Sequence, residues 1–220
     1  MKKLFGLILL VSVLVGCNQN TGRNGECVIK GTVVNKDLEG KRIFLVPMFG
    51  PQDAAHVDSI EIRDGKFEFR KDTVMMAKIV MDYHYRFNTQ TLLVATEPGT
   101  VEVVIDTVSS AKGTPQNDAL QRWKEMTEVH NAQLRVRSEE LGVRSEGVKR
   151  EERMRGDSIR LAYKQQSRKL AADMEDGVVK DFISGMFPLT YKRKMPDGSL
   201  VEIDADTNEP VKKMRNEENE

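Results

Sequence analysis

The 220-residue chain has few of the side chains that most often carry enzyme chemistry: two cysteines, three histidines and one tryptophan. The cysteines, Cys17 and Cys27, do not form the Cys-x-x-Cys pair that thiol-disulfide oxidoreductases use. The chain also lacks a glycine-rich phosphate loop and a Gly-x-Ser-x-Gly element. These absences argue against cysteine-pair redox catalysis, phosphate-loop nucleotide binding and serine hydrolase chemistry within this chain.

No apolar run is long enough to cross a membrane. The longest, residues 4–15, is about a dozen residues, whereas a membrane-spanning helix needs about 20. The run follows Lys2 and Lys3 and leads into Leu14-Val15-Gly16-Cys17, which predicts a signal peptide over residues 1–16. This ending resembles the lipobox of bacterial lipoproteins. The resemblance implies that the thiol of Cys17 receives a diacylglyceryl group and its freed amine an acyl chain, which together anchor the protein stably.

Two other interpretations of this N-terminus stay open: an ordinary secretory signal with a chance cysteine, and the first strand of a cytosolic domain. Under the lipoprotein interpretation the protein lies in the cell envelope. Asn18 stands where an aspartate would be an inner-membrane retention signal, which favours the outer membrane, at its periplasmic face or at the surface.

The charge of the chain is balanced. It has 34 basic and 34 acidic residues, and loss of Lys2 and Lys3 with the signal peptide leaves 32 against 34, a net charge of −2. This balance gives no electrostatic reason to expect a nucleic acid partner. We interpret the one short basic run, residues 192–194, as a solvated strand face.

The first part of the mature chain is predicted to be a β domain. Residues 17–26 form a polar tether. From residue 27 to residue 110, short runs rich in Val, Ile and Phe are separated by turn residues, which predicts an antiparallel β-sandwich or a partly open barrel. Asp64-Gly65 is the clearest hairpin turn, and Pro98-Gly99 is predicted to connect the last two strands. The seven expected strands are residues 27–34, 41–47, 56–63, 66–70, 77–83, 91–96 and 100–106.

A helical hairpin is predicted over residues 111–182. Thr114 can cap a helix whose first residue is Pro115, where the missing amide hydrogen costs nothing. Residues 136–139 recur one heptad later as 143–146, which favours an exposed helical tip. Apolar and aromatic residues spaced by three and four mark the packed faces, Leu120, Trp123, Thr127, His130 and Leu134 in one helix and Ile159, Tyr163, Leu170, Met174 and Val178 in the other.

Residues 183–220 complete an α+β chain. A short β-hairpin is predicted from residues 189–194 and 199–204, which flank Met195-Pro196-Asp197-Gly198. A charged end begins at Asn208 and is predicted to be disordered.

Four segments resemble, in their order, a family: the domain of unknown function that precedes thioredoxin-like domains of the alkyl hydroperoxide reductase type in envelope thiol-disulfide oxidoreductases. The resemblance covers about residues 27–180 and implies no catalytic residue there. Relatives continue into a thioredoxin-like domain with a Cys-x-x-Cys, which this chain lacks. The segments are Ile29-Lys30-Gly31-Thr32-Val33, the stretch from Asp58-Ser59 to Asp64-Gly65-Lys66-Phe67-Glu68-Phe69, Glu97-Pro98-Gly99, and Gly113-Thr114-Pro115-Gln116-Asn117-Asp118-Ala119-Leu120.

We predict no catalytic, cofactor-binding or metal-binding residue. Asp53-x-x-His56 and Asp82-x-His84 are the nearest approaches to a metal pair, and His130 stands alone. Ser59, Asp58 and His56 lie in one short stretch, whereas the members of a catalytic triad usually come from separate segments. We interpret these residues as polar strand and surface positions, Trp123 as a core residue, and Cys27 as a buried apolar residue in preference to a reactive thiol.

Two functions follow. The first is an envelope-anchored, non-catalytic lipoprotein with a binding or scaffolding role. The second is an accessory or truncated form of a thiol-disulfide oxidoreductase that acts with a separate thioredoxin-like protein, with Cys27 available for a mixed disulfide. The hairpin around Pro196-Asp197-Gly198, which is similar to the opening strands of a thioredoxin-like domain, is the basis of the truncation hypothesis.

Overall fold

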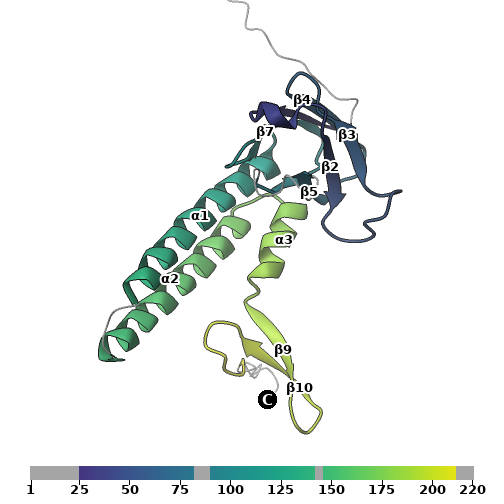
Figure 1. Cartoon of the computed structure of the whole chain (residues 1–220). Helices are drawn as coiled ribbons and strands as arrows, with labels where there is room; N and C mark the ends of the chain where they lie inside the picture. Colours follow the sequence, from purple (N-terminus) through teal and green to yellow (C-terminus); the bar gives the residue numbers. More distant parts are fainter. Residues whose placement is uncertain (1–24, 82–89, 142–145, 212–220) are drawn as a thin grey trace, which may run out of the picture.

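Two four-stranded sheets and three helices make up most of the fold (Figure 1). The computed structural model describes residues 25–81, 90–141 and 146–211, without the side chains of residues 137–153 and 155. One sheet has the spatial order β4 (Lys66–Lys71), β1 (Cys27–Val33), β7 (Gly99–Ile105) and β8 (Ser110–Lys112). The other has the order β3 (Asp58–Glu61), β2 (Arg42–Pro47), β5 (Met76–Met81) and β6 (Leu92–Ala95).

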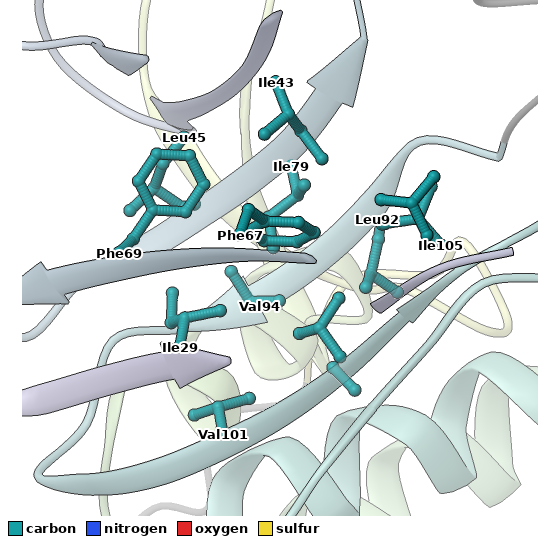
Figure 2. Close-up of a cluster of buried hydrophobic side chains, with 14 of the residues drawn as sticks. Ile29, Ile43, Leu45, Phe67, Phe69, Ile79, Leu92, Val94, Val101 and Ile105 are labelled. Atoms are coloured by element: carbon teal, nitrogen blue, oxygen red, sulfur yellow. The ribbon is translucent and has the colours of Figure 1, made fainter. Parts of the chain in front are cut away.

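The core lies between these two sheets (Figure 2). Ile29 and Val101 from the first sheet share one buried cluster with Ile43, Ile79 and Val94 from the second. Each buried side chain of this size contributes about 1.5–3 kcal/mol of hydrophobic free energy. The sheets do not close into a barrel, so the predicted α+β class with a β-sandwich is confirmed.

Glycine at position 31 is required by the packing of the core. A Cβ at Gly31 would lie 1.9 Å from the ring of Phe67, which covers β1 from the neighbouring strand. Phe67 also packs against Phe69 at 5.6 Å between ring centroids. In the first family-like segment, residues 29–33, a side chain at position 31 is therefore excluded by the ring of Phe67.

The strand connections differ from the predicted antiparallel pattern in one pair. β1 and β7 are parallel, with Ile29 opposite Val101. The chain between them contains β4 and all four strands of the second sheet. Strand propensity, which is a local signal, does not carry this information.

Both predicted turns exist, but each joins different sheets. Asp64 and Gly65 have φ of +54° and +66°, as a tight hairpin turn needs. Beyond this turn, β3 and β4 share only the bridge between Arg63 and Lys66 and then separate into the two sheets. Likewise, the segment with Pro98 and Gly99 carries the chain from β6 to β7, in the opposite sheet, so it is not a hairpin between paired strands.

The short strand β8 was not predicted from the sequence.

The predicted pair of helices is confirmed as α1 (Pro115–Leu141) and α2 (Glu146–Ala172), which lie antiparallel (Figure 1). The hydroxyls of Thr127 and Tyr163 are 2.6 Å apart, and the ring of Tyr163 stacks on His130 at 4.3 Å. The tip of the hairpin, residues 142–145, lies outside the described residues, so the predicted exposed tip stays a prediction. No helix in the described part of the chain is both long and apolar enough to cross a membrane.

The start of α1 is as predicted, but the side chain that caps it is not. The carboxylate of Glu97 accepts hydrogen bonds from the backbone N–H groups of Gln116 (2.8 Å) and Asn117 (3.3 Å). The Thr114 hydroxyl instead accepts a hydrogen bond from the Asn117 side-chain amide. Glu97 is distant in sequence, so the local capping rule pointed to Thr114.

The second predicted helix is in fact two helices. α2 ends at Ala172, and Val178, expected in the same helix, begins α3 (Val178–Met186). Gly177 precedes α3 with extended backbone, and a Cβ there would meet the Gln116 side chain at 2.3 Å. The close approach of α1 therefore fixes where α3 begins.

The C-terminal hairpin is confirmed as β9 (Thr190–Lys194) and β10 (Leu200–Asp204). The basic residues 192–194 are exposed, as predicted. Residues 209–211 return along β10, so the predicted disorder does not begin at Asn208, and residues 212–220 lie outside the described part. The hairpin is held to α2 by Lys164 and Arg168, which both bond Asp206 and thereby lower the pKa of its carboxyl.

Candidate binding groove

The short helix α3 has apolar side chains on two neighbouring faces. Val179 and Ile183 are fully buried in a cluster with Trp123 and the sheet. Phe182 and Met186 point to the other face, where Met186 is 50% exposed. At about 100° per residue, the large apolar side chains of α3 form one stripe about 140° wide, as in an ordinary amphipathic helix. The part of this stripe that carries Phe182 and Met186 is open on its outer side.

This open face forms one side of a groove of about 960 Å³. That volume is at the upper end of the range of small-ligand sites, about 300–1,000 Å³. The Phe182 ring meets Trp123 edge to face at 5.7 Å and lies 6.5 Å from Phe49. The groove is lined by Met48, Phe49, Val74, Met75, Met76, Leu93, Trp123, Val178, Asp181, Phe182, Gly185 and Met186.

The chemistry of the lining is almost purely apolar. Four of its residues are methionines, whose flexible and polarisable side chains adapt to ligands of different shape. Among the described residues, Asp181 is the one charged side chain in the lining, and it is exposed. The described part of the lining contains no basic side chain and no paired nucleophile and base. The groove is therefore suited to holding an apolar ligand, with a place for positive charge at Asp181.

The groove exists because α1, α3 and β6 are locked together at the start of α1. Asn117, fully buried, accepts a hydrogen bond from the Ala95 N–H (2.9 Å) and donates one to the Ala95 carbonyl (2.8 Å). The neighbouring Gln116 accepts a hydrogen bond from the Val179 N–H at the first turn of α3 (3.0 Å). Two successive side chains thus fix the edge of the second sheet and the helix that forms the groove.

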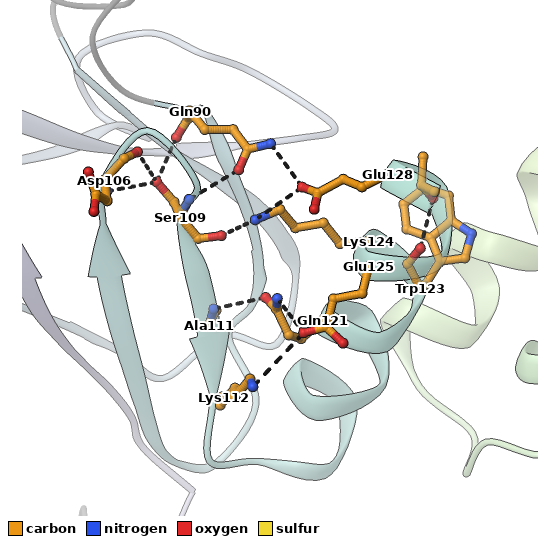
Figure 3. Close-up of polar contacts among 11 residues, drawn as sticks. Gln90, Asp106, Ser109, Ala111, Lys112, Gln121, Trp123, Lys124, Glu125 and Glu128 are labelled. Atoms are coloured by element: carbon orange, nitrogen blue, oxygen red, sulfur yellow. Dashed lines mark hydrogen bonds and ion pairs between the residues drawn. The ribbon is translucent and has the colours of Figure 1, made fainter. Parts of the chain in front are cut away.

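A second polar network holds α1 against the turn between β7 and β8 (Figure 3). The ammonium of Lys124 donates to the Ser109 carbonyl and lies 3.8 Å from Glu128. Gln121 accepts a hydrogen bond from the Ala111 N–H (3.3 Å). Burial lowers the pKa of Lys124, although the nearby glutamates act in the opposite direction. Because these groups satisfy one another, we assign the network to structure.

The structure places Cys27 in the core, in agreement with its prediction as a buried apolar residue. It is 1% exposed, and burial raises the pKa of its thiol to about 11, with smaller contributions from Glu97 and Glu26. Cys17, the predicted lipidation site, lies outside the described residues. Trp123 is 7% exposed and donates a hydrogen bond to the Ser167 hydroxyl. It is thus a core residue, as predicted, and also lines the groove.

The histidine candidates are not brought together. The ring of His56 bonds Asp53 at 2.6 Å on the surface, which lowers the pKa of that carboxyl. His130 stacks on Tyr163 and has a pKa lowered first by burial and then by Arg160. Asp82 and His84 lie outside the described residues.

No group of three or more metal-ligating side chains occurs in the described part of the chain. Ser59 accepts a hydrogen bond from Arg42 (3.0 Å) and has no contact with His56 that would suggest a triad.

The sequence reasoning missed the groove. The segment Val-Val-Lys-Asp-Phe-Ile-Ser-Gly-Met of α3 has the pattern of an ordinary amphipathic helix, so its sequence does not reveal that part of the apolar stripe is exposed. The rest of the lining comes from four separate stretches, which no local pattern connects.

Comparison with protein families gave one match. Residues 27–120 match the family model of a domain of unknown function, DUF4369. The comparisons with curated proteins and with solved structures gave no match. The DUF4369 region contains both sheets and the first residues of α1. It therefore includes the groove residues from Met48 to Leu93, whereas Trp123 and α3 lie beyond it.

Cys27, the first residue of the DUF4369 region, should resist alkylation in the folded protein. At pH 8 a thiol with a pKa of about 11 is thiolate in about one molecule in a thousand, and burial blocks the reagent as well. With Cys17 replaced by Ser, iodoacetamide should label the folded protein slowly and the denatured protein at once, as followed by mass spectrometry. Rapid labelling of the folded protein would contradict this account and support a mixed disulfide.

Proposed function

We propose that this chain is a lipid-anchored, non-catalytic binding protein of the bacterial cell envelope, and that its groove holds an apolar segment of a partner protein. The observation that carries the proposal is the open apolar groove beside α3. Phe49 is 67% exposed and Met186 is 50% exposed on its two sides. Contiguous exposed apolar surface of this kind marks interaction sites in soluble domains.

Covering the groove is energetically favourable. Apolar surface removed from water contributes about 25 cal/mol for each Å². The exposed side chains of Met186 and Phe49 on the rim can adjust to a partner, while Met76, Trp123 and Phe182 are held by the packing beneath them. The groove thus combines a fixed base with an adaptable rim, which favours a binding role.

The charge of the groove distinguishes among ligands. Asp181 would repel the carboxylate of a fatty acid, and none of the described lining residues is basic and able to pair with a carboxylate or a phosphate. A protein segment with apolar side chains and a lysine or arginine matches both the apolar lining and Asp181. We therefore favour such a segment over a free lipid.

The anchor follows from the sequence around Cys17. Residues 17–26, when extended, span at most about 35 Å, so the groove would act close to the membrane surface. The second candidate function is an accessory role beside a thioredoxin-like protein, with Cys27 forming a mixed disulfide. Because Cys27 is buried, its thiol is not accessible for such a disulfide. A thioredoxin-like protein could still be the docking partner, but nothing in the groove selects it.

Replacing Cys17 by Ser tests the anchor. Without the thiol no diacylglyceryl group can be attached, and a single weak membrane contact does not anchor a protein. The Cys17→Ser variant should move from the membrane fraction to the soluble fraction of lysed cells, as seen by immunoblotting. Continued membrane fractionation of the variant would contradict lipidation at Cys17.

A charge placed in the groove tests the binding site. Nile red, an uncharged apolar dye, should bind a protein of residues 18–220, which carries no acyl chains, with a rise in its fluorescence. The Phe49→Glu variant should bind the dye at least about tenfold more weakly, because a carboxylate in an apolar site must be desolvated. Its stability should change little, since Phe49 is largely exposed.

Val129→Glu is the matched control, because Val129 is 60% exposed but lies on α1 outside the groove lining. This variant should bind Nile red as the wild type does. Equal loss in both variants, or no loss in Phe49→Glu, would show that the dye does not report the groove and would overturn the proposal.

A further inference from the structure

At Gly185 the groove lining has a position without a side chain. Gly185 lies in α3 with ordinary helical backbone, and a Cβ built there would meet no atom within 4 Å. Gly31 and Gly177, by contrast, are each required by a neighbouring side chain of the same chain. Glycine weakens a helix relative to alanine. The open space beside Gly185 leaves room for the backbone of a partner to approach α3 closely.

We propose that the partner segment is an amphipathic α-helix that crosses α3 at Gly185 and places a lysine or arginine beside Asp181. This proposal rests on the proposed function. Helices pack at 8–10 Å depending on the side chains at the contact, and glycine permits the closest approach. A helix docks into an apolar groove through residues at i, i+3, i+4 and i+7. The groove already presents Val178, Phe182 and Met186 at matching intervals on α3.

The position of the charge supports this geometry. Asp181 and Gly185 are four residues apart in one helix, so they are neighbours on its surface. Within the described residues, no ion pair involves the Asp181 carboxylate. A basic residue of the partner, about one helical turn from the close contact at Gly185, would reach it.

The C-terminal segment of this chain fits less well. Residues 212–220, Lys-Lys-Met-Arg-Asn-Glu-Glu-Asn-Glu, contain a single apolar residue and cannot present an apolar helix face. A fatty acid also fits less well, because Asp181 would repel its carboxylate. A partner helix with basic residues matches the apolar lining, the Asp181 carboxylate and the open space at Gly185.

The test uses the full mature chain and the fluorescence of Trp123, which is its one tryptophan and lines the groove. The probe is a Leu/Lys peptide of about 18 residues, or five helical turns, with one apolar face. A peptide of the same composition with the leucines scattered, and lauric acid, are the comparison ligands. The amphipathic peptide should bind saturably, and the scattered peptide and lauric acid at least about tenfold more weakly.

The Gly185→Ala variant should bind the amphipathic peptide roughly tenfold more weakly, because the added methyl group separates the helices. Its melting temperature should be equal to or higher than that of the wild type, so lost binding cannot be assigned to unfolding. Asp181→Asn should also weaken binding. Gly156→Ala, in α2 and outside the groove, is the matched control and should bind normally.

Two results would overturn the helix proposal: equal binding by Gly185→Ala and wild type, or equal or tighter binding of the scattered peptide or of lauric acid. If Nile red still binds and Phe49→Glu still loses it, only the helix proposal has failed. If Nile red shows no groove-dependent binding either, the proposed function has failed with it.

Discussion

The buried side-chain amide of Asn117 is the contact on which the arrangement of sheets and helices depends. β6 is an edge strand of the second sheet, and Asn117 pairs with both backbone groups of Ala95 as a further strand would. A buried polar group left without its partner costs about 1–3 kcal/mol, so this double hydrogen bond strongly favours one position of α1 at the edge. Glu97 then caps α1, and Gln116 holds the first turn of α3.

The groove is a consequence of that junction. Because α1 begins at the edge of β6, Trp123 lies two turns later against Phe182, and α3 is left with one apolar face toward solvent. The family-like segment from Gly113 to Leu120 therefore acts structurally: its residues join a sheet edge, a helix start and a second helix. The function that we propose uses the surface formed around this joint and makes no use of the one buried thiol.

Features encoded by neighbouring residues were predictable from the sequence. The alternation of apolar residues identified seven strands, and Asp64 and Gly65 marked a turn. The spacing of apolar residues by three and four identified α1 and α2. Features that depend on distant residues were not predictable. The parallel pairing of β1 with β7, the capping of α1 by Glu97 and the separate helix α3 each arise from contacts between remote segments. Periodicity likewise identified Trp123 as buried but could not show that its other side forms a groove.

The central claim is that the groove is covered by a partner in the native envelope. The most direct measurement is the rate of peroxide oxidation of Met186 in intact cells and in the purified mature protein, with Met154 of α2 as the internal reference. The two side chains are 50% and 57% exposed, so both should oxidise at similar rates in the purified protein. In cells we expect Met186 to be protected from oxidation, because a partner covers it, and Met154 to be oxidised as in the purified protein. Equal oxidation of the two methionines in cells would contradict it.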